Sequence, residues 1–467
     1  MNFRRVAMIG AFFALMMLSQ WVAVVLLSAG TALAAARWGV EVARSRDMGR
    51  VKDRPDDALL LGSDLQGGPV MLGRRQLGAH GLILGASGSG KSTTLLAILD
   101  DHVRVGAPVV AIDLKGSPSF EAQLRRAADS AGRPFAVWTP DGPSHWNPLA
   151  HGNPTELKDK LIASERFTEP HYQRAAERYV QMVFGVLELT QPTEATLATV
   201  VELMEPQRLA TLVRGLPEPR ATRVQDYLAG LGSDQLSAIR GLGTRLAVIS
   251  ESHTGRFLEP GSGPSIDVRR ALAGEEVVLF SLNSSTYGTL SAQLGTLVIQ
   301  DLVAAVGDRL KSSSQPQAII AIDEFSALGA DNVISLLARG REAGAGVVLV
   351  TQELADIDRA ARGLRDQVLG NTAVKLAHRQ DVPASAETVA QMAGTETVWE
   401  NTFALGSGPL GRYDSSRGTR REVERYVVHP NKIKSLRTGE AVLLSGGSGN
   451  RARTVRVQAR SRDGPER

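Results

Sequence analysis

The stretch that decides the fold is His80-Gly-Leu-Ile-Leu-Gly-Ala-Ser-Gly-Ser-Gly-Lys-Ser-Thr-Thr94. Its first part, residues 80–84, is a short apolar run that ends at a glycine, which predicts a buried strand. Residues 85–90 contain three glycines and predict a tight turn. Leucine or isoleucine then occupies positions 95, 96, 98 and 99, which predicts the apolar face of a helix. A strand, a glycine-rich turn and a helix in this order predict an α/β unit.

The turn also matches the phosphate-binding pattern G-x-x-x-x-G-K-[ST]. Three of its glycines are expected to take positive φ angles, so that backbone N–H groups can surround phosphate oxygens at the start of a helix. Lys91 is predicted to reach the β- and γ-phosphates of ATP, and the Ser92 hydroxyl to ligate Mg²⁺. A flexible turn with no ligand is the alternative. The predicted nucleotide contacts are Gly85, Ala86, Ser87, Gly88, Ser89, Gly90, Lys91, Ser92 and Thr93.

An acidic pair, Asp323-Glu324, follows the fully apolar run of residues 318–322, which is typical of a central parallel strand. The carboxyl ends of such strands face the phosphate loop in open α/β sheets. Asp323 is therefore predicted to hold Mg²⁺ through water, and Glu324 to polarise the attacking water as general base. The alternative is a pair of solvated turn carboxylates.

Two further polar residues are candidates for catalysis. Gln352 directly follows an apolar strand pattern at residues 347–351, and it is predicted to sense the γ-phosphate. Arg341 lies in Gly340-Arg-Glu-Ala-Gly344 and is predicted to reach the nucleotide of a neighbouring subunit, where a guanidinium stabilises developing phosphate charge. The alternative is a solvated arginine at a helix end, and Arg339 competes for the same role.

Strand and helix patterns alternate through most of the chain, which predicts an α/β, RecA-like fold with a mostly parallel central sheet. Between residues 155 and 250 the apolar period is helical, so an all-helical domain is expected to divide the nucleotide-binding domain into residues 58–154 and 251–446. Residues 400–425, rich in Gly, Ser, Arg and Asp, predict a mobile loop, and residues 447–467 a basic tail. Strands are predicted at residues 80–84, 108–113, 134–138, 276–282, 318–322, 347–351, 373–376 and, as the last one, 441–444.

The N-terminal residues 6–36 contain no charged side chain. As a helix they would reach roughly 46 Å, against about 30 Å of bilayer hydrocarbon, which predicts a transmembrane anchor of one span or a tight hairpin. A cleaved signal peptide and a buried core helix are the alternatives. The following linker, residues 37–57, is rich in basic residues, which favours a cytoplasmic location for the rest of the chain. Arg4 and Arg5, before the run, favour the opposite orientation.

The composition sets only broad limits on function. The absence of cysteine excludes disulfides and thiolate metal sites. A net charge of +4 over 467 residues permits nucleic-acid binding without requiring it.

Taken together, these motifs resemble the FtsK/HerA-type DNA-pump ATPases. Within that group the chain is similar to the type IV coupling proteins of conjugation and type IV secretion, the TraG/TraD family. The closer resemblance depends on the N-terminal apolar run, the helical insertion, Asp113-Leu-Lys-Gly116, and the segment from Ser385 to the strand predicted at residues 441–444. Two features depart from the family pattern, namely a single apolar run in place of two separate spans and a tail without an acidic extension.

The resemblance implies a homohexameric ring at the bacterial inner membrane, with its ATPase domain in the cytoplasm and DNA passing through the ring. It also implies ATP and Mg²⁺ as cofactors, and the secretion channel and relaxosome-type proteins as partners. An FtsK-like double-strand DNA pump would carry a C-terminal winged-helix module, for which about 20 residues remain after the last predicted strand. A protein-exporting type IV secretion ATPase is a second alternative. A nucleotide-gated scaffold is a third, and it would be expected to lack Lys91 or Glu324.

Overall fold

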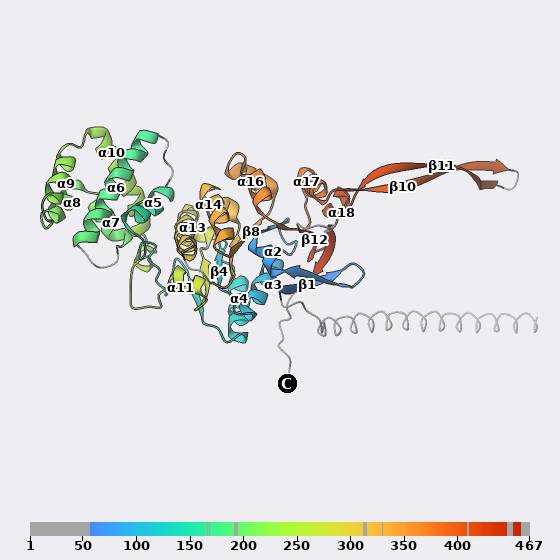
Figure 1. The fold of residues 1–467 in the computed structure, drawn as a ribbon, viewed down its shortest axis with the longest axis horizontal. Coiled ribbons are helices and arrows are strands. Elements are labelled where there is room, and N and C mark those ends of the chain that lie inside the picture. Colours follow the sequence, from blue (N-terminus) through green and yellow to red (C-terminus); the bar gives the residue numbers. More distant parts are fainter. Residues whose placement is uncertain are drawn as a thin grey trace, which may run out of the picture.

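A computed structural model of the chain describes residues 57–458, apart from residues 166, 168, 191–194, 312–314, 329, 409–410 and 446–451. The apolar run at residues 6–36 and all of the predicted linker except residue 57 lie outside the described residues. Figure 1 shows an elongated molecule, with a helical domain at one end and a two-stranded arm at the other.

A large sheet forms the centre of the molecule. In the described residues it has eleven strands in the order β2-β1-β13-β12-β9-β3-β8-β7-β4-β6-β5. The strands from β9 to β5 run parallel to one another, and the other four pair antiparallel at one side. The prediction of a mostly parallel sheet is therefore confirmed. The strands are β1 (Ala58–Asp64), β2 (Pro69–Gly73), β3 (Gly81–Leu84), β4 (Val109–Asp113), β5 (Phe135–Trp138), β6 (Val277–Ser281), β7 (Ala318–Asp323), β8 (Ala345–Thr351), β9 (Val374–Ala377), β12 (Glu440–Ser445) and β13 (Arg453–Val457).

Helices cover both faces of the sheet. Buried side chains of α3 and α4 pack against one face, whereas α11, α13, α14, α16 and α17 pack against the other. The central strands are buried on both faces, which explains why their sequences are continuous apolar runs. The helices of this α/β part are α2 (Arg74–Gly78), α3 (Lys91–Arg104), α4 (Pro118–Ser130), α11 (Val268–Ala273), α12 (Ser284–Tyr287), α13 (Thr289–Arg309), α14 (Ala330–Glu342), α15 (Leu354–Ala360), α16 (Leu364–Asn371), α17 (Pro383–Ala393) and α18 (Pro430–Lys434), with single 3₁₀ turns at Gly255–Phe257 and Phe325–Ala327.

The segment between β5 and β6 contains the all-helical insertion. Six helices form a separate lobe at one end of the molecule (Figure 1), as the helical periodicity of residues 155–250 predicts. They are α5 (Pro154–Ala163), α6 (Pro170–Thr190), α7 (Leu197–Leu203), α8 (Pro206–Val213), α9 (Arg220–Ala229) and α10 (Ser233–Ser250).

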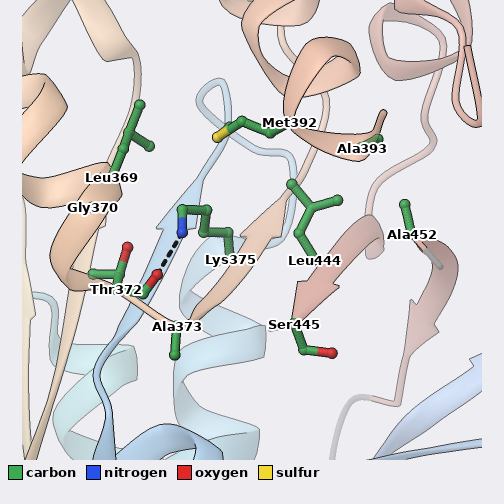
Figure 2. A pocket seen from close by; sticks show the side chains of 10 residues that line it. All are labelled: Leu369, Gly370, Thr372, Ala373, Lys375, Met392, Ala393, Leu444, Ser445 and Ala452. Carbon is green, nitrogen blue, oxygen red and sulfur yellow. Dashed lines mark hydrogen bonds between the residues drawn. The ribbon is translucent and has the colours of Figure 1, made fainter. Parts of the chain in front are cut away.

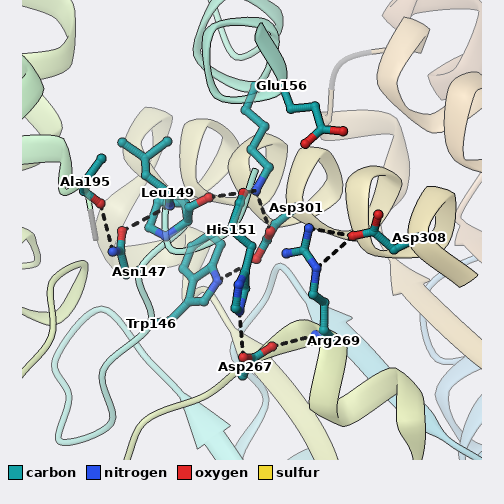
Figure 3. A network of polar contacts seen from close by, with 12 residues as sticks. Trp146, Asn147, Leu149, His151, Glu156, Ala195, Asp267, Arg269, Asp301 and Asp308 are labelled. Carbon is teal, nitrogen blue, oxygen red and sulfur yellow. Dashed lines mark hydrogen bonds and ion pairs between the residues drawn. The ribbon is translucent and has the colours of Figure 1, made fainter. Parts of the chain in front are cut away.

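A buried ion pair joins this lobe to the α/β part. The Lys160 ammonium of α5 donates to Asp301 Oδ1 of α13 at 2.8 Å, and the two side chains are only 4% and 6% exposed. The indole N–H of Trp146 donates to the other Asp301 oxygen at 3.1 Å, within the polar network of Figure 3. Lys160 also donates to the carbonyls of Pro148 (3.1 Å) and His151 (2.9 Å), so all three ammonium protons have acceptors.

The predicted mobile loop at residues 400–425 is wrong. This segment belongs to a long antiparallel hairpin of β10 (Thr395–Gly408) and β11 (Gly411–Tyr426), which projects from the body of the protein (Figure 1). The base of the hairpin has exposed polar residues on both faces, so its sequence lacks the apolar alternation that would predict strands. Local pairs order the ribbon instead, because Glu400 contacts Arg421 at 3.0 Å and Arg425 at 2.6 Å, and Arg420 stacks on Trp399.

The eight predicted strands correspond to β3–β9 and β12. However, the strand at residues 441–444 is not the last one, because β13 lies within the predicted basic tail and inserts between β12 and β1. Among the described helices, α13 alone is long and apolar enough to cross a membrane, and 72% of its apolar window is buried inside the protein. It is thus a core helix of the α/β part.

Candidate nucleotide-binding site

The glycine-rich turn lies between β3 and α3, as its sequence predicts. Gly88 and Gly90 have φ angles of +71° and +110°, which residues with a side chain rarely adopt. The Lys91 side chain folds back over the loop, and its ammonium donates to the carbonyls of Gly85 at 2.7 Å and Ala86 at 3.2 Å. The loop therefore surrounds a cationic group at the start of a helix.

The donor groups of the loop fit a phosphate ligand. Ser89 Oγ is buried and has no hydrogen-bond partner among the described residues. Ser92 is exposed and Thr93 half-buried in the first turn of α3, where the N–H groups of a helix favour anions. The predicted positive φ of Gly85 is wrong. Glycine is needed there for a different reason, since a Cβ would lie 2.6 Å from the Cβ of His378.

Two buried aspartates lie side by side at the carboxyl ends of adjacent strands. Asp113 of β4 is in register with Asp323 of β7, and each is at most 5% exposed. Burial, followed by repulsion from Asp113 and Glu324, raises the pKa of Asp323 to about 6. Burial also raises the pKa of Asp113, although its carboxylate accepts hydrogen bonds from the N–H groups of Lys115 and Ser117. Two carboxylates this close favour a cation between or beside them.

Glu324 has a φ of +55°, which is uncommon for a residue with a side chain and costs energy that the surrounding structure must supply. Its N–H donates to Asp323 Oδ1 at 3.0 Å. Its carboxylate contacts the Lys115 ammonium at 2.5 Å and accepts from Gln352 Nε2 at 3.0 Å. The backbone of Gln352 in turn accepts from the N–H of Gly85 at 3.3 Å. One continuous set of contacts thus links the acidic turn to the phosphate loop.

The charges at this edge of the sheet influence one another. Burial lowers the pKa of Lys91, while the negative charges of Glu324 and Asp323 act in the opposite direction. Burial also disfavours the charged form of Lys115, but the hydrogen bond and charge of Glu324 outweigh it and raise its pKa. The structure therefore brings Lys91, Asp323, Glu324 and Gln352 together, although the chain separates them widely.

Arg341 lies elsewhere. It is exposed in the last turn of α14, and its charge acts on His80, which precedes β3. The phosphate loop follows the other end of β3, roughly 16 Å away along the strand. Arg341 is therefore not part of the site formed within its own chain, so any contact with a nucleotide needs a second copy.

Two residues of the site have no role in the sequence prediction. Lys115 pairs with Glu324, and Asp113 lies beside Asp323. Both belong to the Asp113-Leu-Lys-Gly116 segment, which follows an apolar strand pattern just as Asp323-Glu324 does. That shared position was the signal available in the sequence, but only the strand order shows that β4 and β7 are neighbours.

A separate surface cavity of about 560 Å³ opens beside β9 and β12, between α16 and α17 (Figure 2). Burial lowers the pKa of Lys375, which lines it. Its ammonium donates to the carbonyl of Thr372, the C-terminal cap of α16. A cation is favoured at a helix C-terminus, so Lys375 already has a structural role there.

The parallel sheet, the glycine loop that opens α3 and the acidic strand end define an α/β protein of the P-loop class. Solved structures share this fold. The unbound conjugative coupling protein TrwBΔN70 has a TM-score of 0.63 and 15% identity, over 88% of this chain and 91% of that one. TrwB in complex with ADP and Mg²⁺ has a TM-score of 0.61 and 15% identity, over 89% and 93%. VirB4 of Thermoanaerobacter pseudethanolicus has a TM-score of 0.54 and 15% identity, over 87% and 98%.

A search of curated protein sequences gives no match. The family model of the type IV secretion-system coupling protein DNA-binding domain, in contrast, matches residues 66–454. The chain therefore belongs to the family of type IV secretion-system coupling proteins.

Proposed function

We propose that this protein is a membrane-anchored, ATP-driven DNA translocase that links a processed DNA substrate to a type IV secretion channel. The observation that carries the proposal is the convergence of the Lys91 loop with Asp323, Glu324 and Gln352 at one edge of the sheet. Family membership supports the transport role, and the ADP and Mg²⁺ bound to TrwB, which shares the fold, support the choice of cofactors.

The phosphate loop binds the triphosphate in this proposal. Its N–H groups and Lys91 neutralise phosphate oxygens, with Thr93 nearest the α-phosphate. Ser92 and Asp323 hold Mg²⁺, which supplies Lewis-acid stabilisation of the charge that develops on the phosphates. A pKa of Asp323 near 6 means that the carboxylate is mostly charged, and ready to hold a cation, at neutral pH.

Glu324 is the proposed general base. Lys115 and Gln352 hold its carboxylate from two sides, which fixes its orientation. Gln352 also contacts the loop through its backbone, so a change at the phosphates can reach Glu324 through one residue. Arg341 is proposed to act on the nucleotide of a neighbouring subunit in a homohexameric ring, because its own site is at the other end of β3.

The N-terminal run at residues 6–36 is proposed to anchor the ring in the bacterial inner membrane, with the α/β part in the cytoplasm. DNA would pass through the ring, and the helical lobe would face the relaxosome-type proteins that deliver it. The lobe lies at the far end of the molecule from the hairpin arm (Figure 1), so it is free to contact such partners.

ATP turnover measured with and without DNA tests the proposal. A fragment starting near residue 50 should hydrolyse ATP, and single- or double-stranded DNA should stimulate it. The matched control is Glu324→Gln, which should still bind ATP but turn over roughly 10²- to 10⁴-fold more slowly. Hydrolysis that neither DNA stimulates would favour a protein exporter, and no hydrolysis by the wild type would refute the motor itself.

A further inference from the structure

The phosphate loop packs against residues 438–439, which directly precede β12. Thr438 Oγ1 donates to the carbonyl of Gly88 at 3.1 Å, and the N–H of Gly439 donates to the carbonyl of Ser89 at 2.9 Å. In a trans peptide the C=O and the following N–H point in opposite directions. Holding the Ser89 carbonyl outward therefore directs the N–H of Gly90 toward the inside of the loop.

The loop lies so close to Gly439 and His378 that two of its glycines have no room for a side chain. A Cβ on Gly90 would lie 2.9 Å from the backbone nitrogen of Gly439 and 3.5 Å from Cε1 of His378. A Cβ on Gly85 would meet the Cβ of His378 at 2.6 Å. Both glycines of the motif are thus required by contacts behind the loop as well as by the loop itself.

His378 connects Glu440, at the start of β12, to α3, the helix that follows the loop. It is fully buried, and its Nδ1 lies 2.9 Å from the carbonyl of Glu440, which can only accept a hydrogen bond. Nδ1 therefore carries the proton, and Nε2 accepts from the Thr94 hydroxyl at 2.9 Å. Burial lowers the pKa of His378 to about 4, so the ring keeps this neutral form at physiological pH.

Residues 439 and 440, which lie beside the loop, form hydrogen bonds with β13. Glu440 accepts from the N–H of Arg437 at 3.1 Å and from Arg456 Nη2 at 3.2 Å. The carbonyl of Gly439 accepts from the N–H of Val457 at 2.8 Å. The residues that contact the loop are thus held by β13, which pairs directly with β12.

We propose that Thr438, Gly439 and His378 are positioning residues of the nucleotide site. Their contacts are with the loop and with Thr94 of α3, and they hold the loop in the conformation that presents its N–H groups. Preorganisation of this kind raises affinity, because binding need not also order the loop. The inference rests on the proposed function, since it assumes that the loop binds a nucleotide.

Four variants of the full-length protein test the proposal by titration with the fluorescent nucleotide mantADP. Thr94→Val and His378→Asn each break the buried Thr94–His378 bond, and each should weaken binding about tenfold. His378→Asn keeps a donor for the Glu440 carbonyl, so the fold is expected to survive. Thr438→Val should weaken binding about threefold, because its bond is exposed to water. Thr94→Ser retains the hydroxyl and should bind like the wild type.

The pattern of kinetic constants separates positioning from a general structural role. With saturating ATP, kcat of the variants should stay within about twofold of the wild type while KM rises, since the bound substrate and the transition state lose the same binding energy. The double variant Thr94→Val/His378→Asn should lose no more than either single one, because both break the same bond. Thr388→Val is the control, since the Thr388 hydroxyl bonds only to its own helix on the exposed side of α17.

Wild-type mantADP affinity in Thr94→Val and His378→Asn would overturn the inference, as would a loss of kcat at unchanged affinity. A wild-type protein that bound no mantADP would instead overturn the proposed function, and this inference with it. The two failures are therefore distinguishable in one titration series.

Discussion

The buried pair between Lys160 and Asp301 leads to a quantitative prediction about the junction of the two parts of the molecule. Asp301→Asn keeps the shape of the side chain and its bond to Trp146, but it leaves the Lys160 charge without a counter-ion. Lys160→Met leaves the Asp301 charge in the same way. Removing one partner of a buried ion pair typically costs about 3–5 kcal/mol of the free energy of unfolding.

The double variant Lys160→Met/Asp301→Asn should cost much less than the sum of the two. Neither charge is then left buried, and the remaining loss is the hydrogen bonds to the carbonyls of Pro148 and His151. The coupling energy between the two substitutions is therefore expected to be on the order of 3 kcal/mol. An exposed helical pair provides the contrast, and Glu121→Gln beside Arg125 should cost less than about 1 kcal/mol.

Urea unfolding followed by tryptophan fluorescence measures these differences, because Trp138 and Trp146 are both buried close to the junction. A cost below about 1 kcal/mol for either single variant would refute the reasoning. So would additive costs in the double variant, since additivity means that the two charges do not depend on each other.

The remaining predictions concern the site. Lys91→Ala should abolish ATP turnover in a phosphate-release assay, and retained activity would remove Lys91 from the site. Glu324→Gln should accumulate bound ATP while hydrolysis falls roughly 10²- to 10⁴-fold; a near-normal rate would mean that another group is the base. Arg341→Ala subunits should still bind ATP, and in mixed rings they should abolish ATP hydrolysis at the neighbouring site. If each subunit loses only its own activity, the role of Arg341 is structural. Finally, the pKa of buried His378 is about 4, against 6.5 for an ordinary histidine. Between these two pH values the unfolded chain binds more protons than the folded protein. The free energy of unfolding therefore falls as the pH drops from 6.5 to 4. At about 1.4 kcal/mol per pKa unit, the wild type should lose up to about 3 kcal/mol of its free energy of unfolding, relative to His378→Asn, over this pH range. Urea unfolding at pH 7 and 4.5 measures this difference. An equal pH dependence of the two proteins would contradict the prediction.

The sequence was most informative where strands are buried on both faces. The continuous apolar runs that become β4, β7 and β8 need no partner to be recognised, because every residue in them contacts the core. The phosphate loop was equally clear, since its glycines and lysine occupy fixed positions between a strand and a helix.

Prediction failed where neighbours far along the chain decide the structure. The strands β10 and β11 support each other, with polar side chains on both faces of the base, so their composition indicates a loop. The short strand β13 carries two arginines and is recognisable only beside β1 and β12. At the site, the partnership of Lys115 with Glu324 depends on the order of the strands, which no local pattern contains.

The pairing of β1 with β13 also has a consequence for how the protein folds during its synthesis. Gly62 pairs with Val457, which leaves the ribosome much later in translation. Contacts so distant in sequence form slowly, because a long chain must first be closed. Since β13 also supports Gly439 behind the phosphate loop, we expect a nascent chain to remain unable to hold ATP firmly until translation has passed that strand. Nucleotide capture would then report that β13 has been synthesised and has joined the sheet.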